Sequence, residues 1–429
     1  MTDTAPPANE TKDAGRQHRL RRMVGRDPGE KNRGATPLEL FFDLTLVVAF
    51  AQAGSETAHL VAEGHITAAI LAFAFVMFAV CWAWINFSWF ASAFDTDDWF
   101  YRVTTMVQMV GVLVLALGIP DIFESVDHGE PVDNTVAVAG YIVMRVAMLA
   151  QWIRVARQDP AHARVALGYA ITITVSQLGW TGALFFDLRI GAFLPLALVL
   201  IGIELIGPIL AERRDGGTPW HPHHIAERYG LLVIITLGEG ILGTIAAVAA
   251  LVDHVDWSAE AILVAVAGVG LTFGLWWNYF IIPSADVLEH HRHRSWGWGY
   301  GHIPLLAAIA AIGAGIHVAA YVVEGEATIG VIGAVLATAI PVAIATLAYF
   351  VLYSYLVRGF DPFHLGLFAA TMAVLGLAVA LAAQGLSLGW SLIIVMLAPV
   401  VTIVGFESIG HRHMAAALER TLADVSPGR

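Results

Sequence analysis

Apolar runs of about twenty residues recur along this chain, and they constrain its fold more than any other feature. An α-helix rises about 1.5 Å per residue, so about twenty residues cross the roughly 30 Å hydrocarbon core of a bilayer. The sequence contains twelve such segments: 37–55, 66–91, 103–120, 135–156, 164–186, 190–211, 229–251, 259–282, 300–322, 327–357, 364–384 and 388–409. The pattern predicts an all-α, polytopic helical membrane protein with about 12 transmembrane helices.

The composition agrees with this class of protein. Hydrophobic residues make up 58% of the chain and charged residues only 14%, whereas soluble domains carry about 25% charged residues. The single cysteine, Cys81, lies inside an apolar segment, which excludes an internal disulfide and a multi-cysteine metal site. We therefore expect the lipid bilayer as the main partner, and no nucleic acid.

The charges of the loops predict the orientation in the plasma membrane. If the N-terminal tail is cytoplasmic, the loops on the same side hold Arg102, Arg154, Arg157, Arg164, Arg213, Arg214, Arg228, Arg292, Arg294 and Arg358. The opposite loops hold one basic residue, Arg189, and many acids. This bias follows the positive-inside rule and predicts cytoplasmic N- and C-termini. The basic N-terminal tail is a topology signal with anionic lipid as a second partner.

Short matches between the two halves predict an internal repeat. Residues 84–87 and 276–279 read Trp-Ile-Asn-Phe and Trp-Trp-Asn-Tyr, and Gly118 matches Gly315, as Glu204 matches Glu407. The matches keep their order, so we expect two parallel six-helix repeats. The predicted divisions are a disordered basic tail (1–35), a first half (36–212), a linker (213–220), a second half (221–410) and a C-terminal tail (411–429).

The first apolar segment has a well-specified start. Thr36 suits the N-cap, Pro37 suits the first helical position, and Glu39 completes a capping box three residues after the cap. Capping does not explain Asp43, which lies one turn deeper on the same face. A carboxylate in so apolar a segment needs a partner or a function.

Arg145 is the basic residue nearest the middle of any apolar segment. A buried guanidinium needs a carboxylate, and we consider Asp43, Glu204 and Glu239 as its partners, with Asp43 the most testable. Three interpretations stay open for Arg145: an ion pair that fixes helix register, a charge gate or substrate anchor, or a side chain that extends to the membrane interface.

Glu239 is the residue that we most favour for handling an ion or a proton. It lies about ten residues inside the seventh segment, between Gly238 and Gly240. Residues 238–243 match Gly-x-Gly-x-x-Gly, but no strand precedes them, so small residues that pack helices together explain the match better than a dinucleotide site. Glu407 completes the set of acids, and Gln52, Asn86 and Asn278 are polar companions.

Two histidine clusters flank the seventh and eighth segments: His221, His223 and His224, then His290, His291 and His293. Neither contains a His-Glu-x-x-His motif, so we expect no metal and no cofactor. His302 and His317 lie within the ninth segment, where we consider a proton relay but favour core histidines whose ring nitrogens are hydrogen-bonded. The chain carries no recognisable catalytic motif, and we expect no enzyme activity.

Two stretches resemble a known family. Residues 38–44 read Leu-Glu-Leu-Phe-Phe-Asp-Leu, and residues 224–239 run from His-Ile-Ala-Glu-Arg to Leu-Gly-Glu. Both resemble motifs of the bacterial low temperature requirement protein A (LtrA) family, in the expected order and within a resemblance spanning roughly 33–410. Gly240 stands where the family pattern has Ser. The resemblance implies a polytopic membrane protein and supplies no reaction.

The leading functional hypothesis is a transporter or channel for a small ion or solute. Its site would lie near Asp43, Arg145, Glu204, Glu239 and Glu407. The alternatives are an intramembrane enzyme that acts on a lipid or isoprenoid, and a membrane scaffold or sensor that does not transport.

Overall fold

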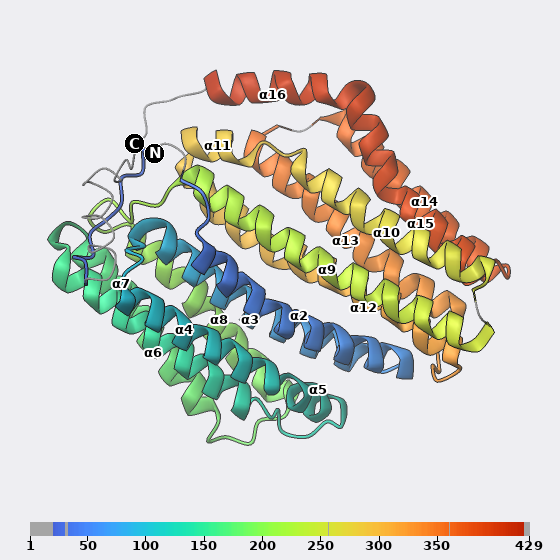
Figure 1. The fold of residues 1–429 in the computed structure, drawn as a ribbon, viewed down its shortest axis with the longest axis horizontal. Coiled ribbons are helices and arrows are strands. Elements are labelled where there is room, and N and C mark those ends of the chain that lie inside the picture. Colours follow the sequence, from blue (N-terminus) through green and yellow to red (C-terminus); the bar gives the residue numbers. More distant parts are fainter. Residues whose placement is uncertain (1–19, 31–32, 256, 360, 424–429) are drawn as a thin grey trace, which may run out of the picture. The chain divides into compact units, whose positions relative to one another are not determined.

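The computed structural model describes residues 20–30, 33–255, 257–359 and 361–423. The helices in chain order are α2 (Pro37–Glu63), α3 (Ile66–Phe94), α4 (Trp99–Leu117), α5 (Ile119–Asp127), α6 (Thr135–Gln158), α7 (Ala163–Ala183), α8 (Ile190–Glu212), α9 (Pro222–Val255), α10 (Ala259–Phe280), α11 (Ser284–His290), α12 (Ser295–Glu324), α13 (Val331–Val357), α14 (Pro362–Ala383), α15 (Leu388–Gly405) and α16 (His411–Ala423) (Figure 1). The fold is all-α, as predicted.

Within these residues, eleven helices are long and apolar enough to cross a membrane. The remaining predicted segment, 164–186, forms α7, which is a helix of 21 residues but falls outside that set. Its sequence carries Thr172, Thr174, Ser176, Gln177 and Thr181, and these polar side chains lower its apolar character. The class of multi-pass membrane protein is confirmed, with eleven candidate spans where we predicted twelve.

Local capping explains where several helices begin. The Asp98 carboxylate accepts from the backbone N–H of Tyr101 at 2.9 Å and caps α4. Asp361 does the same for α14 through the N–H of Phe363, also at 2.9 Å. These side chains satisfy N–H groups that lack a partner in the first turn of a helix.

The contacts divide the chain into two compact units. The first comprises Met1–Thr45, Asn86–Gly118 and Val132–His221, and the second comprises Leu46–Ile85, Ile119–Pro131 and Pro222–Arg429. Helices α2 and α3 thus contribute residues to both units. The break after His221 lies beside the predicted linker, 213–220, but the units do not follow the two sequence halves elsewhere.

In the first unit, each long helix from α4 onward packs on the next long helix along the chain. Helix α4 packs on α6, α6 on α7, and α7 on α8. Glycines bring α4 and α6 together, because a Cβ on Gly140 would lie 2.6 Å from the carbonyl oxygen of Gly111. Small residues therefore provide the close approach in this unit.

The second unit is organised around α12. This helix packs against α9 and α13, while α10 packs against α9 and α15, and α14 packs against α13 and α15 (Figure 1). A Cβ on Gly313 of α12 would lie 2.5 Å from the carbonyl carbon of Glu239 in α9. The two backbones therefore meet at the position of Glu239.

Part of the stretch predicted to be disordered has a defined path. The backbone N–H groups of Met23 and Gly25 donate to the side chains of Gln158 and Asp159, each at 2.7 Å. Residues 1–19, which include much of the basic tail proposed to meet anionic lipid, lie outside the described residues. At the other end, residues 411–423 of the predicted tail form α16.

Candidate functional site

Arg145 of α6 and Glu204 of α8 form a buried ion pair in the first unit. Arg145 Nη2 lies 2.9 Å from Glu204 Oε2, and the side chains are only 5% and 3% exposed. The guanidinium also lies 5.0 Å from the ring centroid of Tyr141. Of the three partners considered from the sequence, the structure selects Glu204 and not Asp43.

The start of α2 carries two fully buried acids, Glu39 and Asp43. The Glu39 carboxylate accepts from the N–H of Thr36 at 2.7 Å, and the Thr36 hydroxyl accepts from the N–H of Glu39 at 3.3 Å. This is the reciprocal geometry of a capping box. Asp43 lies one turn further on, beside Phe42, whose ring stacks on Phe87 with centroids 3.9 Å apart. On α3, Asn86 is half-buried.

A second carboxylate shares the environment of Glu39. Arg33 Nη2 lies 3.4 Å from Glu39 and 3.6 Å from Asp95, and all three side chains are buried. Burial raises the pKa of Asp95 to about 6, and the negative charge of Glu39 adds to this effect, which Arg33 only partly offsets. Asp95 therefore titrates near neutral pH at the end of α3.

Glu239 occupies the place where α2, α9 and α12 meet in the second unit. The residue is only 6% exposed. Its carboxylate makes no hydrogen bond or ion pair with any residue that the structure describes. A Cβ on Gly54 of α2 would lie 3.4 Å from Glu239 Oε2. Glycines on two neighbouring helices therefore leave the space that this carboxylate fills.

The glycines around Glu239 pack helices together, as the sequence indicated. A Cβ on Gly240 would lie 2.6 Å from the hydroxyl of Thr272 in α10, and one on Gly243 would collide with the backbone of Gly313 in α12. The Gly-x-Gly-x-x-Gly match thus lies inside a helix with close neighbours on two sides.

Polar side chains continue from Glu239 along α12 and α2. His317 lies one turn beyond Gly313, and its ring stacks on that of Tyr321 with centroids 5.4 Å apart. The Tyr321 ring in turn lies 6.1 Å from that of His59 in α2. On the same helix, Gln52 donates to Glu56 at 2.8 Å. The second unit therefore holds a row of polar groups that leads from Glu239 to the C-terminal end of α2.

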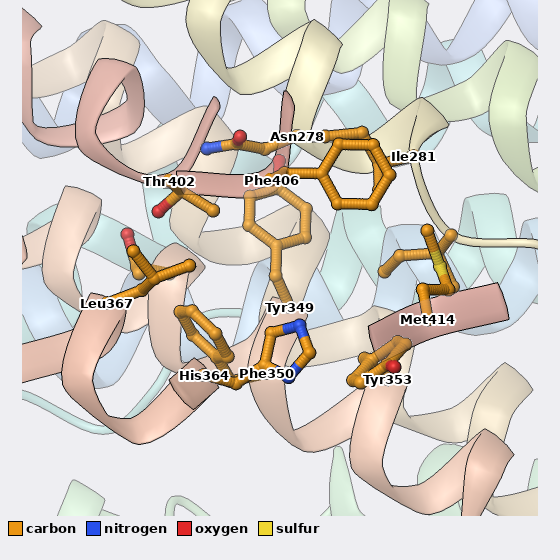
Figure 2. Close-up of a pocket in the computed structure, with 12 residues that line it drawn as sticks. Asn278, Ile281, Tyr349, Phe350, Tyr353, His364, Leu367, Thr402, Phe406 and Met414 are labelled. Atoms are coloured by element: carbon orange, nitrogen blue, oxygen red, sulfur yellow. The ribbon is translucent and has the colours of Figure 1, made fainter. Parts of the chain in front are cut away.

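Asn278 lies in a different place, at a small pocket in the second unit. Figure 2 shows Asn278 with side chains from α13, α14 and α15, and Tyr349, His364 and Thr402 are among the residues that line the pocket with it. The pocket has about 50 Å³ of space. The amide nitrogen of Asn278 donates to the carbonyl oxygen of Pro399 at 3.4 Å.

Glu407 differs from our expectation of a buried acid. It is exposed and accepts from the indole N–H of Trp277 at 3.3 Å. Residues Phe406–Gly410 form a π-helical turn after α15. The expected burial rested on the place of Glu407 in an apolar segment and on its match to Glu204, and a π turn at this point alters the direction in which side chains leave the helix.

The histidines resolve into structural and surface groups. His302 is fully buried and both ring nitrogens are engaged, one with the carbonyl oxygen of Trp298 at 2.7 Å and the other with the Tyr279 hydroxyl at 3.0 Å. His302 is therefore a satisfied core residue. His224 is fully buried, whereas His223 is exposed and lies 3.0 Å from Glu289, so these neighbours occupy different environments.

Two polar centres had no signal strong enough to be found from the sequence. Glu212, at the end of α8, accepts from the indole of Trp89 at 3.0 Å and from the Tyr169 hydroxyl at 2.8 Å. Arg154 pairs with Asp98, and its guanidinium also donates to the backbone carbonyl of Arg21 at 2.6 Å. Both lie at segment ends, where charged residues are ordinarily solvated.

The helices and their buried charges define a polytopic helical membrane protein with ionisable groups inside its helical units. The chain belongs to the bacterial low temperature requirement A protein (LtrA) family, which it matches over residues 34–399. It is also 29% identical over 214 residues to an uncharacterised protein of Rhizobium meliloti strain 1021. That match covers 48% of this chain and 49% of the relative, about half of each. No solved structure matches the chain.

Proposed function

We propose that the protein transports a small ion across the membrane and that Glu239 is the group that binds it. The proposal is carried by one observation: Glu239 is buried within a candidate span and has no polar partner among the described residues. An ionised carboxylate in such a place is unfavourable by several kcal/mol unless it is neutralised. A proton or a bound cation would neutralise it, and release of either would complete a transport step.

The row of polar groups beyond Glu239 supports a path for the ion. His317, Tyr321 and His59 follow it toward the end of α2, where Glu56 and Glu63 add negative charge. Acidic side chains at an opening raise the local concentration of cations. A cation or proton is therefore favoured over an anion.

Arg145 and Glu204 receive a structural role in this proposal. Their charges neutralise each other at 2.9 Å, so neither is free to bind an ion of its own. The pair joins α6 to α8 and fixes how these helices align. This favours the interpretation of Arg145 as a register-fixing ion pair over that of a gate.

The internal repeat remains part of the proposal, and each half carries a bond between a tryptophan and a glutamate near the end of its last long helix. In the first half, the indole of Trp89 donates to Glu212, at the end of the sixth long helix. In the second half, the indole of Trp277 donates to Glu407, just after the sixth long helix of that half. These bonds join different positions of the sequence match, in which Glu407 corresponds to Glu204, and we infer from that match that both halves have the same orientation with cytoplasmic termini.

The test is flux into liposomes that contain the purified full-length protein. Uptake of K⁺, Na⁺ and H⁺ would be measured for the wild type, Glu239→Gln and the control Glu407→Gln, which removes an exposed acid of the same unit. We expect Glu239→Gln to abolish flux and Glu407→Gln to retain it. Equal flux in both variants would reject Glu239 as the site, and no flux of any of these ions in the wild type would reject the transport proposal.

An intramembrane enzyme is the second function considered from the sequence, and it has less support. It would use the histidines and acids near the start of α9, where His223, Glu227 and Asp286 line a pocket of about 290 Å³. His223 is bonded to Glu289 at the surface, and its neighbour His224 is buried away from it. The pair therefore does not supply two imidazoles to one reaction centre.

A further inference from the structure

The end of α2 holds a group of side chains with the chemistry of a metal site. Among the residues that the structure describes, one group of three or more His, Cys, Asp or Glu side chains brings its ligand atoms within 4.8 Å of one another: Glu63, His65 and Asp127. They come from the last residue of α2, the α2–α3 loop and the last residue of α5. All three belong to the second unit.

The distances within this group suit a bound ion. The Nδ1 atom of His65 lies 2.8 and 2.9 Å from the two carboxylate oxygens of Asp127, and 3.8 Å from Glu63 Oε2. Ligands at about 2.1 Å from a tetrahedral metal ion lie about 3.4 Å from one another. The observed separations lie on both sides of that value, so shifts of about half an ångström would bring the three atoms to the geometry of shared coordination.

The backbone holds these ligands in place. Gly64 adopts φ +87°, which ends α2 and turns the chain back, and its N–H donates to the carbonyl oxygen of Val61 at 3.0 Å. The N–H of His65 donates to the carbonyl oxygen of Leu60 at 2.8 Å. This pattern of bonds is typical of a helix C-terminus closed by a left-handed glycine. His65 therefore projects from a fixed position.

A second histidine lies beside this group on the same helix. His59 precedes Glu63 by four residues, so the two share a face of α2, and His59 Nε2 lies 3.7 Å from Glu63 Oε1. The loop after α12 braces this turn, since the N–H of Thr328 donates to the carbonyl oxygen of Ala62 at 2.8 Å. One imidazole and two carboxylates supply three protein ligands, and a water molecule would complete a tetrahedral set.

We propose that Glu63, His65 and Asp127 bind a divalent transition-metal ion such as Zn²⁺ at the end of α2. The mixed nitrogen and oxygen ligands favour Zn²⁺ over Mg²⁺ and Ca²⁺, which prefer oxygen ligands alone. The ion would join α2 to α5 and neutralise two carboxylates. The site shares Glu63 with the far end of the polar row that begins at Glu239, but metal binding does not require that the protein transport an ion.

The test is a calorimetric titration of the purified full-length protein in detergent with Zn²⁺ alone, which measures the affinity and stoichiometry of binding. Even loss of a residue that only orients a ligand weakens metal binding by about 10–100-fold, so loss of a direct ligand in His65→Ala or Asp127→Asn should weaken this site by about 100-fold or more. The matched control is His128→Ala, which removes an exposed imidazole beside Asp127 and should leave the site intact.

Two results would overturn the proposal. The first is binding of Zn²⁺ by His65→Ala and Asp127→Asn with the stoichiometry and affinity of the wild type. The second is a loss in His128→Ala as large as that in His65→Ala, which would indicate non-specific binding by surface histidines. The altered side chains are partly exposed, and size-exclusion chromatography would verify that each variant keeps the wild-type fold.

Discussion

Arg145 Nη2 and Glu204 Oε2 lie 2.9 Å apart across α6 and α8, and both side chains are almost completely buried. Two opposite charges so close inside a candidate membrane protein satisfy each other. Removal of one would leave the other uncompensated in an apolar environment, and this asymmetry leads to a direct prediction about stability.

Replacement of one member of this pair should destabilise the protein strongly. We expect Arg145→Met or Glu204→Leu alone to lower the free energy of unfolding by about 3 kcal/mol or more, because an unpaired charge stays buried. The double variant should recover most of that loss, since no charge remains. Thermal unfolding in detergent would measure all three. A double variant no more stable than either single variant would contradict the interpretation of an isolated ion pair.

The control for that experiment is the exposed pair between Arg102 and Asp97, which lies 2.7 Å apart with both side chains about half exposed. Surface pairs contribute about 0–1 kcal/mol, so Asp97→Asn should have little effect on unfolding.

Asp95 should make the stability depend on pH between about 4 and 6. Burial, aided by Glu39, raises its pKa to about 6 from the ordinary value of 3.8, so the folded protein binds this proton more tightly than the unfolded chain. The stabilisation from Asp95 is full below about pH 4 and is lost as the pH rises through 6. Asp95→Asn should remove this fall from melting curves recorded across that range. An unchanged pH profile in the variant would show that Asp95 does not have the raised pKa.

The glycines of α9 offer a matched pair of substitutions. A Cβ on Gly243 would collide with the backbone of Gly313, whereas one on Gly238 would meet nothing within 4 Å. We expect Gly243→Ala to destabilise by about 1–3 kcal/mol through overpacking. Gly238→Ala should be neutral or stabilising by up to about 1 kcal/mol, because alanine favours helix. Thermal unfolding would compare them, and equal effects would argue against close packing of α9 on α12.

The segment around Arg21 should be released when its anchor is lost. The Asp98 carboxylate accepts from the N–H of Arg21 at 3.0 Å and pairs with Arg154. Burial would raise the pKa of Asp98, but its hydrogen bonds from Arg154, Tyr101 and Arg21 outweigh this and hold it below the ordinary value.

Loss of this carboxylate removes a helix cap and leaves the buried guanidinium of Arg154 uncompensated, which is unfavourable by about 3 kcal/mol or more and corresponds to at least about 100-fold faster cleavage when proteolysis follows local opening. We therefore expect Asp98→Ala to speed trypsin cleavage after Arg21 and Arg22 by that factor. The control Asp97→Ala alters an exposed neighbour and should cleave at the wild-type rate. Identical rates in the two variants would contradict the anchoring role.

The sequence alone determined the class of protein and the place of most helices. Apolar length and turn chemistry are local properties, so the twelve segments, the start of α2 at Thr36 and Glu39, and the family motifs could all be read directly. The same reading placed Glu239 among helix-packing glycines. The one segment that departs, 164–186, forms the helix α7 as expected. Its Thr, Ser and Gln side chains make it too polar to count among the candidate membrane spans.

Only the tertiary structure decided which charges meet. Arg145 had three possible carboxylates, and its partner Glu204 lies 59 residues away, a distance along the chain that no local pattern spans. Glu407 lies exposed in a π turn, and the turn at Gly64 brings Glu63 and His65 close to Asp127 of another helix. Helix formation depends on neighbours in sequence, whereas ion pairs and ligand groups depend on how helices pack, and packing is set by the whole chain.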